Sequence, residues 1–121
     1  MTALDLGSIQ HVSINVSNLE QSLAFYELSL GLSRLARPDL SVEGAWLAVG
    51  SSELHLIVAV GSTPAAGQHF AFGVVDLDAT RSSLIEAGIQ VSNPTSLGNG
   101  ASQAFFSDPD GNLLEINQPA P

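Results

Sequence analysis

The chain has 121 residues and a mass of 12.5 kDa, which suits a single domain with one hydrophobic core. Twelve Asp and Glu residues against three Arg and no Lys give a formal net charge of −9, so the basic stripe that nucleic acids and anionic membranes require is missing. The absence of cysteine excludes disulfides and thiolate ligands, and no basic leader or long apolar run is present, so we expect a cytoplasmic protein.

The first predicted element is a strand over residues 9–16, where apolar and polar side chains alternate. Ser17 and Glu20 then have the spacing of a capping box at a helix start. Leucines at helical spacing follow, and Gly31 suits a left-handed C-cap, so we predict a helix over residues 18–30.

Three strand-like runs come next, at residues 32–36, 45–49 and 53–60. A Gly-, Pro- and Ser-containing stretch at 61–67 is typical of a flexible connector. After it the same order returns, with a predicted helix at 76–87 and strands near 89–91, 102–106 and 113–117.

The two halves of the chain align without a gap at an offset of 58, which places His11 opposite His69. We therefore predict an α+β protein of two βαβββ modules, one at about 9–60 and the other at about 68–118. Each module would cover one face of its sheet with its helix and leave the other face open, so both open faces need a partner.

Candidate metal ligands lie on these open faces. His11 and His69 occupy the same place in the repeat, and Glu115 lies on the corresponding face of the last strand. Two imidazoles and one carboxylate with vacant positions suit a divalent ion such as Fe, Mn, Co, Ni or Zn, with Mg as a further possibility.

Other polar and aromatic residues could complete the site. His55 is a candidate fourth ligand or proton carrier, and Glu53 competes with it for the acid–base role. Ser13, Trp46 and Phe105 are the candidates for substrate contact, although core packing also explains the two aromatics. A purely structural role for the histidines is the remaining alternative.

Nearly the whole chain resembles the vicinal-oxygen-chelate superfamily, which includes glyoxalase I, bleomycin-resistance proteins, fosfomycin-modifying thiol transferases and extradiol dioxygenases. The resemblance rests on Phe25-Tyr26 before Leu30-Gly31-Leu32, and on Asp108-Pro-Asp-Gly-Asn ahead of Glu115. It implies a U-shaped sheet around one metal and ligands at His11, His69 and Glu115. In such families the sheet is commonly completed across a homodimer by exchange of modules, so we expect a homodimer and leave the exchange open.

The resemblance further implies a lyase, isomerase or dioxygenase whose substrate chelates the metal through neighbouring oxygens. Residues 92–103 contain no basic residue, which disfavours a phosphonate site in that loop, and only Arg34, Arg37 or Arg81 could supply cations for glutathione. The alternative is a protein of the bleomycin-resistance kind that sequesters a small molecule without chemistry. The negative net charge of this chain would suit a cationic ligand.

Overall fold

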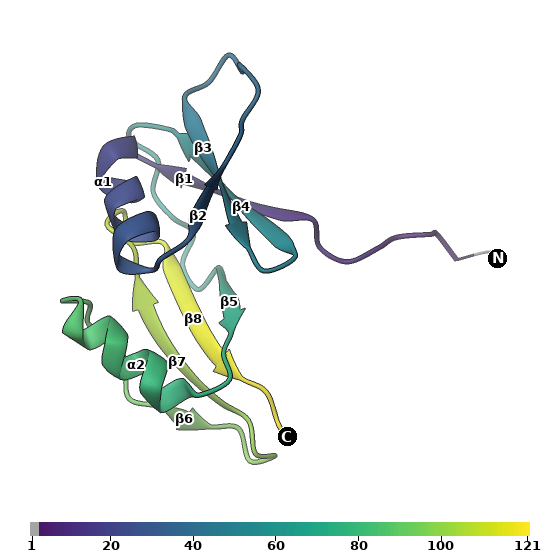
Figure 1. The fold of residues 1–121 in the computed structure, drawn as a ribbon, viewed down its shortest axis with the longest axis vertical. Helices are drawn as coiled ribbons and strands as arrows, with labels where there is room; N and C mark the ends of the chain where they lie inside the picture. The colour runs from purple at the N-terminus through teal and green to yellow at the C-terminus, as the bar shows by residue number, and fades with distance from the viewer. Residues whose placement is uncertain (1–2) are drawn as a thin grey trace. The chain divides into compact units, whose positions relative to one another are not determined.

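The computed structural model describes residues 3–121, which form two compact units, one ending at Ser62 and the other beginning at Thr63. Figure 1 shows that each unit combines a curved sheet with one helical segment.

The first unit holds one four-stranded mixed sheet in the order β1-β4-β3-β2. β1 runs parallel to β4, and the other neighbours are antiparallel. Its elements are β1 (His11–Val16), α1 (Leu19–Leu23), the π-helix η1 (Ala24–Ser29), β2 (Ser33–Leu35), β3 (Gly44–Val49) and β4 (Ser52–Val58).

The helical segment of the first unit differs from the single helix predicted over 18–30. Asn18, not Ser17, caps α1, because Asn18 has extended backbone angles and its side-chain oxygen accepts a hydrogen bond from the Gln21 N–H at 2.9 Å. After Leu23 the helix widens into the π-helix, and the Leu30 N–H reaches back to the Phe25 carbonyl. The segment still ends before Gly31, whose φ is 77°.

The second unit repeats this plan, with a sheet in the order β5-β8-β7-β6 and with β5 parallel to β8. The strand predicted at 89–91 is wrong: the edge of this sheet is β6, because Thr95 and Ser96 pair with β7. Its elements are β5 (His69–Gly73), α2 (Leu77–Glu86), β6 (Thr95–Ser96), β7 (Ser102–Ser107) and β8 (Leu113–Gln118).

Each sheet has an apolar face and a more polar one, as strand alternation requires. In β4 and β8 the buried Leu54, Leu56, Leu114 and Ile116 point to the apolar face, which forms the core. In the second unit α2 covers this face, and the N–H of Leu77 donates to the Gln118 side chain at 2.8 Å. The opposite, open face of each sheet carries the predicted site residues. The predicted α+β fold of two βαβββ modules is confirmed.

Candidate functional site

A His–Glu pair lies on the open face of the second unit. His69 begins β5, and Glu115 lies in the neighbouring strand β8, opposite Ala71 in the parallel register. His69 Nε2 lies 3.0 Å from Glu115 Oε1, and the two side chains are 33% and 7% exposed. The fold thus brings together two of the three predicted ligands.

Hydrogen bonds on the far side of each group fix the orientation of this pair. His69 Nδ1 donates to the Gly67 carbonyl at 2.9 Å, and Asn117 Nδ2 donates to Glu115 Oε2 at 2.8 Å. Since a carbonyl only accepts, Nδ1 carries a proton, and Nε2 is the ring nitrogen turned toward the carboxylate. Histidine ligands of metals are commonly held in this way through the other ring nitrogen.

The same contacts change the charge of the imidazole. The pKa of His69 is raised, mainly by the hydrogen bond to the Gly67 carbonyl; burial opposes this, and the Glu115 carboxylate adds to the rise. Protonated His69 donates to Glu115 from Nε2, so a proton and a metal ion compete for this nitrogen.

Phe105 supports the pair from the adjacent strand β7. Its ring meets the His69 ring edge-on, with centroids 5.3 Å apart, and its backbone lies opposite Glu115. The Phe105 N–H donates to the Ser92 hydroxyl at 2.8 Å, and the Arg81 guanidinium donates to the Ser92 carbonyl at the same distance. The loop that carries Ser92 is therefore tied to both α2 and β7.

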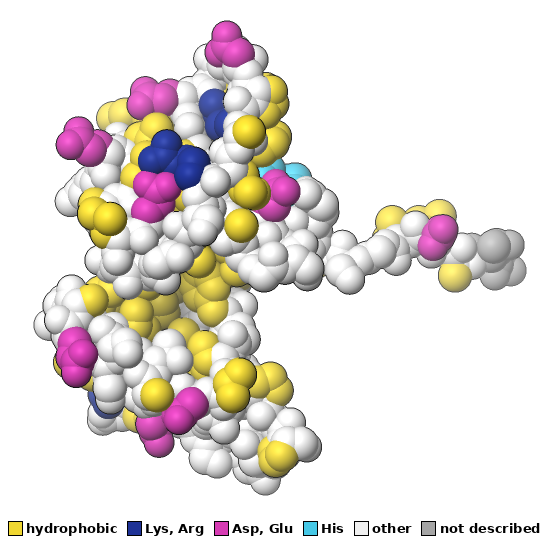
Figure 2. All heavy atoms as spheres, in the orientation of Figure 1, with side chains coloured by type: hydrophobic (Ala, Val, Ile, Leu, Met, Phe, Trp, Pro, Cys, Tyr) yellow, Lys and Arg dark blue, Asp and Glu magenta, His cyan; other side chains and the backbone are white. Residues whose placement is uncertain are grey.

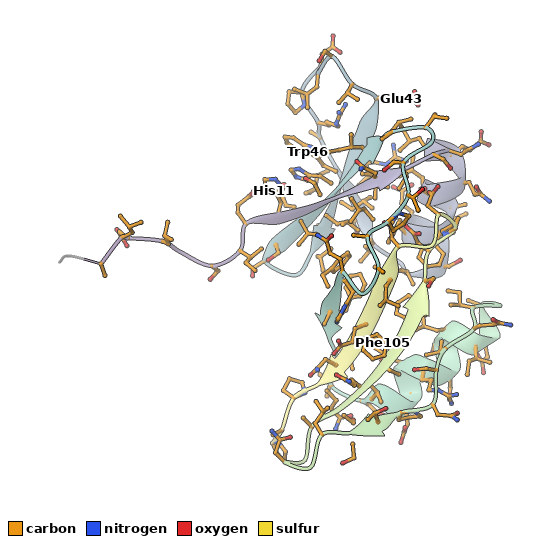
Figure 3. The ribbon with its side chains drawn as sticks, turned by 180° about the vertical axis from the view of Figure 1, so that it is seen from behind. His11, Glu43, Trp46 and Phe105 are labelled. Carbon is orange, nitrogen blue, oxygen red and sulfur yellow. The ribbon has the colours of Figure 1, made fainter. Side chains whose placement is uncertain are left out.

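Three stacked rings occupy the open face of the first unit. The His55 ring is stacked against His11 at 4.1 Å and against Trp46 at 4.3 Å, with interplanar angles of 15° and 6°. His11 and Trp46 lie on the same side of this sheet (Figure 3). Ser13 is exposed on the same face and lies opposite His55 in the register.

An acid–base pair adjoins the rings. His55 is 8% exposed, and its Nε2 lies 2.9 Å from Glu53 Oε1. His11 Nδ1 lies 2.6 Å from the side-chain oxygen of Gln10, which leaves its Nε2 for another partner. The predicted acid–base residues Glu53 and His55 thus form one pair.

The strand register shows which positions of the two units correspond. Ser13 lies opposite His55, and Ala71, 58 residues later, lies opposite Glu115. His55 and Glu115 are thus equivalent positions. Trp46 and Phe105, which lie opposite them in β3 and β7, are equivalent too.

Sequence comparison places the chain in a known group of proteins. The profile of the Glyoxalase/Bleomycin resistance protein/Dioxygenase superfamily matches residues 8–116. The chain belongs to this superfamily. Its members are generally metal-dependent, bind small molecules and often form dimers.

Individual members of the superfamily are similar along most of their length. The protein named glyoxylase I 4 from Arabidopsis thaliana is 33% identical over 93% of this chain and 71% of its own. A glyoxalase family protein from Bacillus anthracis superimposes with a TM-score of 0.87, at 27% identity, over 97% and 98% of the two chains. The antibiotic binding protein TnmS3 from Streptomyces sp. CB03234 has a TM-score of 0.79, at 29% identity, over 98% and 100%.

The metal that the superfamily implies fits the second unit in part. His69 and Glu115 supply one nitrogen and one oxygen donor already turned toward each other. His11 belongs to the first unit, so each unit alone carries only part of the predicted set. Within residues 3–121 no group of three or more His, Asp and Glu side chains is arranged to hold a metal ion.

Three contacts of the site were not predicted from the sequence. Asn117 follows Glu115 at strand spacing, and this spacing could have suggested a contact between them. Gly67 contributes its backbone carbonyl, which every residue type has, so the sequence could not indicate this contact. Gln10, which contacts His11, lies just before β1 and outside the repeat pattern of the strand.

No helix among the described residues is long and apolar enough to cross a membrane.

Proposed function

We propose that the chain is a metal-dependent enzyme acting on a small molecule that presents two neighbouring oxygens, as a lyase, isomerase or dioxygenase. One divalent ion would be held by His11, His69 and Glu115. The first unit, which carries His11, and the second unit, which carries His69 and Glu115, would come from the same chain or from the two chains of a homodimer. The observation that carries the proposal is the His69–Glu115 pair, whose facing atoms are a nitrogen and an oxygen and whose outer atoms are hydrogen-bonded.

The bound ion would supply Lewis acidity to the two substrate oxygens. The protein's own residues would do the rest. Glu53 accepts a hydrogen bond from His55 and so orients the imidazole, which then can take a proton from the substrate and return it. The competing assignment makes His55 a fourth metal ligand. The equivalence of position 55 to the proposed ligand Glu115 favours this assignment.

The rings and the hydroxyl near this pair would position the substrate. Trp46 and Phe105 offer flat apolar surfaces beside His55 and His69, and both are partly exposed. The Ser13 hydroxyl is exposed on the same face as His55 and can donate a hydrogen bond to a substrate oxygen.

Metal content of the untagged protein tests this proposal. We expect one divalent ion per chain in the wild type, and loss of that ion in His69→Ala and in Glu115→Gln. Gln68→Ala, beside His69 but absent from the proposed ligand set, is the matched control and should keep the metal. A wild-type protein that takes up no stoichiometric Zn²⁺, Mn²⁺, Co²⁺, Ni²⁺ or Fe²⁺ would contradict the proposal.

A second candidate is sequestration of a small molecule without chemistry. The stacked rings of the first unit and the similarity to a protein described as antibiotic binding favour it. Thermal shifts with flat aromatic compounds, measured with and without chelator, separate the two functions: stabilisation that a chelator leaves unchanged supports sequestration.

A further inference from the structure

Arg37 lies at the end of the strand that carries Trp46. Its side chain reaches from the loop between β2 and β3 to Gly44, the first residue of β3. A Cβ built on Gly44 would lie 3.1 Å from Arg37 Nη2 and would also clash with the Leu56 carbonyl oxygen. The Leu56 carbonyl is the contact that requires glycine here, and the missing Cβ also leaves room for the guanidinium, two residues from Trp46.

The guanidinium of Arg37 has unused hydrogen-bonding capacity. Nη2 donates to the Val42 carbonyl at 2.7 Å, but Nε is buried and has no hydrogen-bond partner. In the part of the chain that the structure describes, Arg37 forms no ion pair, whereas Arg34 forms a bidentate ion pair with Glu27. Because Nε is buried, an anion would have to meet the terminal nitrogens of the guanidinium, and there it would offset the cost of a half-buried cation that forms no ion pair.

Glu53, the acid paired with His55, lies at the other end of the ring cluster. Along β3, Gly44 precedes Trp46 by two residues, and Ala48, which pairs with Glu53, follows it by two. Arg37 and Glu53 therefore flank the rings from opposite ends and do not neutralise each other. A flat ligand stacked at Trp46 would meet a carboxylate on one side and a guanidinium on the other.

We propose that Arg37 binds an anionic group of the ligand, so that the ligand carries a carboxylate-like group in addition to a flat part and two neighbouring oxygens. The chelating half of this description rests on the proposed function; the anionic half rests on Arg37 and Gly44 alone. Guanidinium groups suit this task because their donors match the two oxygens of a carboxylate.

The net charge of the protein predicts the opposite preference, for cationic ligands, so the two expectations can be told apart by experiment. The net charge is −9, and acidic side chains are spread widely over the face drawn in Figure 2. Long-range repulsion therefore favours cationic over anionic ligands. A preference for the anion would have to come from a local contact.

Three compounds that share a catechol ring and differ only at the end of a short side chain provide the test. They are 3,4-dihydroxyphenylacetate, 4-ethylcatechol and dopamine, which end in a carboxylate, a methyl group and an ammonium group. Affinity is measured by calorimetry with Zn²⁺-loaded and with chelator-treated protein. Quenching of Trp46, the only tryptophan of the chain, shows whether binding occurs at this face.

We expect the carboxylate compound to bind at least about tenfold more tightly than 4-ethylcatechol, and dopamine to bind most weakly. Arg37→Gln should remove the preference for the carboxylate and leave 4-ethylcatechol unchanged, while Arg37→Lys should keep part of it. Arg34→Gln is the matched control and should retain the wild-type order, because its charge is already paired with Glu27. Melting curves identify variants that fail to fold.

Dopamine binding most tightly to the wild type, or an unchanged carboxylate preference in folded Arg37→Gln, would overturn the proposal. Failure of the metal site gives a different pattern. If the Arg37-dependent order persists with chelator and no metal is bound, the anion site stands and the metal-dependent function falls. If binding needs metal but ignores Arg37, the metal site stands and the anion site falls.

Discussion

The two units share one backbone plan and carry different chemistry on it. At equivalent positions of the open face, the first unit has His55 and Trp46 where the second has Glu115 and Phe105. The first unit is built around stacked rings and the second around a hydrogen-bonded His–Glu pair. A repeated fold therefore fixes where side chains lie, while single residues decide what each half can do.

The largest expected effect separates His55 from its counterpart Glu115. Glu115→Ala should weaken Co²⁺ binding at least about a hundredfold, because it removes a charged oxygen donor beside His69. His55→Ala should cost less than about tenfold if His55 carries protons, since Nε2 is occupied by Glu53. Co²⁺ titration followed by visible absorption measures both. Equal losses in the two variants would show that His55 is a ligand and that the halves are chemically alike.

A substitution at Gly44 tests whether the two units accept the same side chains at equivalent positions of β3 and β7. The register makes Gln103 its counterpart, so the second unit carries a long side chain where the first tolerates none. Gly44→Ala should destabilise the protein by about 2 kcal/mol, because the new Cβ meets the Leu56 carbonyl oxygen.

Gly73→Ala is the matched control for Gly44→Ala, because a Cβ there meets no atom within 4 Å. Urea denaturation of both variants gives the two free energies of unfolding. Gly44→Ala unfolding at the wild-type midpoint would show that the strand shifts to make room.

His69 gives the second unit a pH dependence. Its pKa is raised in the folded chain, so its contribution to metal-free stability is full below the unfolded pKa and is lost as pH rises through the folded pKa. Metal affinity should move in the other direction and increase as Nε2 loses its proton. Histidine proton NMR measures the titration, and Glu115→Gln should lower the His69 pKa. An unchanged pKa in that variant would remove Glu115 from the explanation.

The smallest effect concerns the Glu27–Arg34 pair, which joins η1 to β2 and has no ionic counterpart at Arg81 in the second unit. Arg34 lowers the pKa of Glu27, so the stabilisation is present above the unfolded pKa and is lost as pH falls through the folded one. Because the pair is solvent-screened, Glu27→Gln should cost at most about 1 kcal/mol, measured at pH 7. A larger loss would mean that the pair holds the π-helix in place.

Much of this architecture was predictable, because alternation defines the strands and their faces and the offset of 58 matches β1 with β5. The predicted gapless alignment is wrong beyond these strands: Trp46 corresponds to Phe105 and His55 to Glu115, which are offsets of 59 and 60. The strand predicted at 89–91 is absent, and the carbonyls of Val91 and Ser92 accept hydrogen bonds from the Arg81 side chain, a contact with α2 that a local pattern does not contain. The π-helix escaped prediction because its apolar spacing resembles that of an ordinary helix. In the site, His69 and Glu115 could be paired from their register, but the stacking of His11, His55 and Trp46 depends on ring orientation.

The parallel pairing of β1 with β4 has a consequence for how the site forms during folding. β3 and β4 join through a tight turn, so they can pair early, whereas Ser13 and His55 are 42 positions apart along the chain and must be brought together from that distance. In the second unit Ala71 and Glu115 are 44 positions apart. We therefore expect His11 and His69 to reach their partners late in the folding of each unit, so that a formed site marks a nearly complete fold.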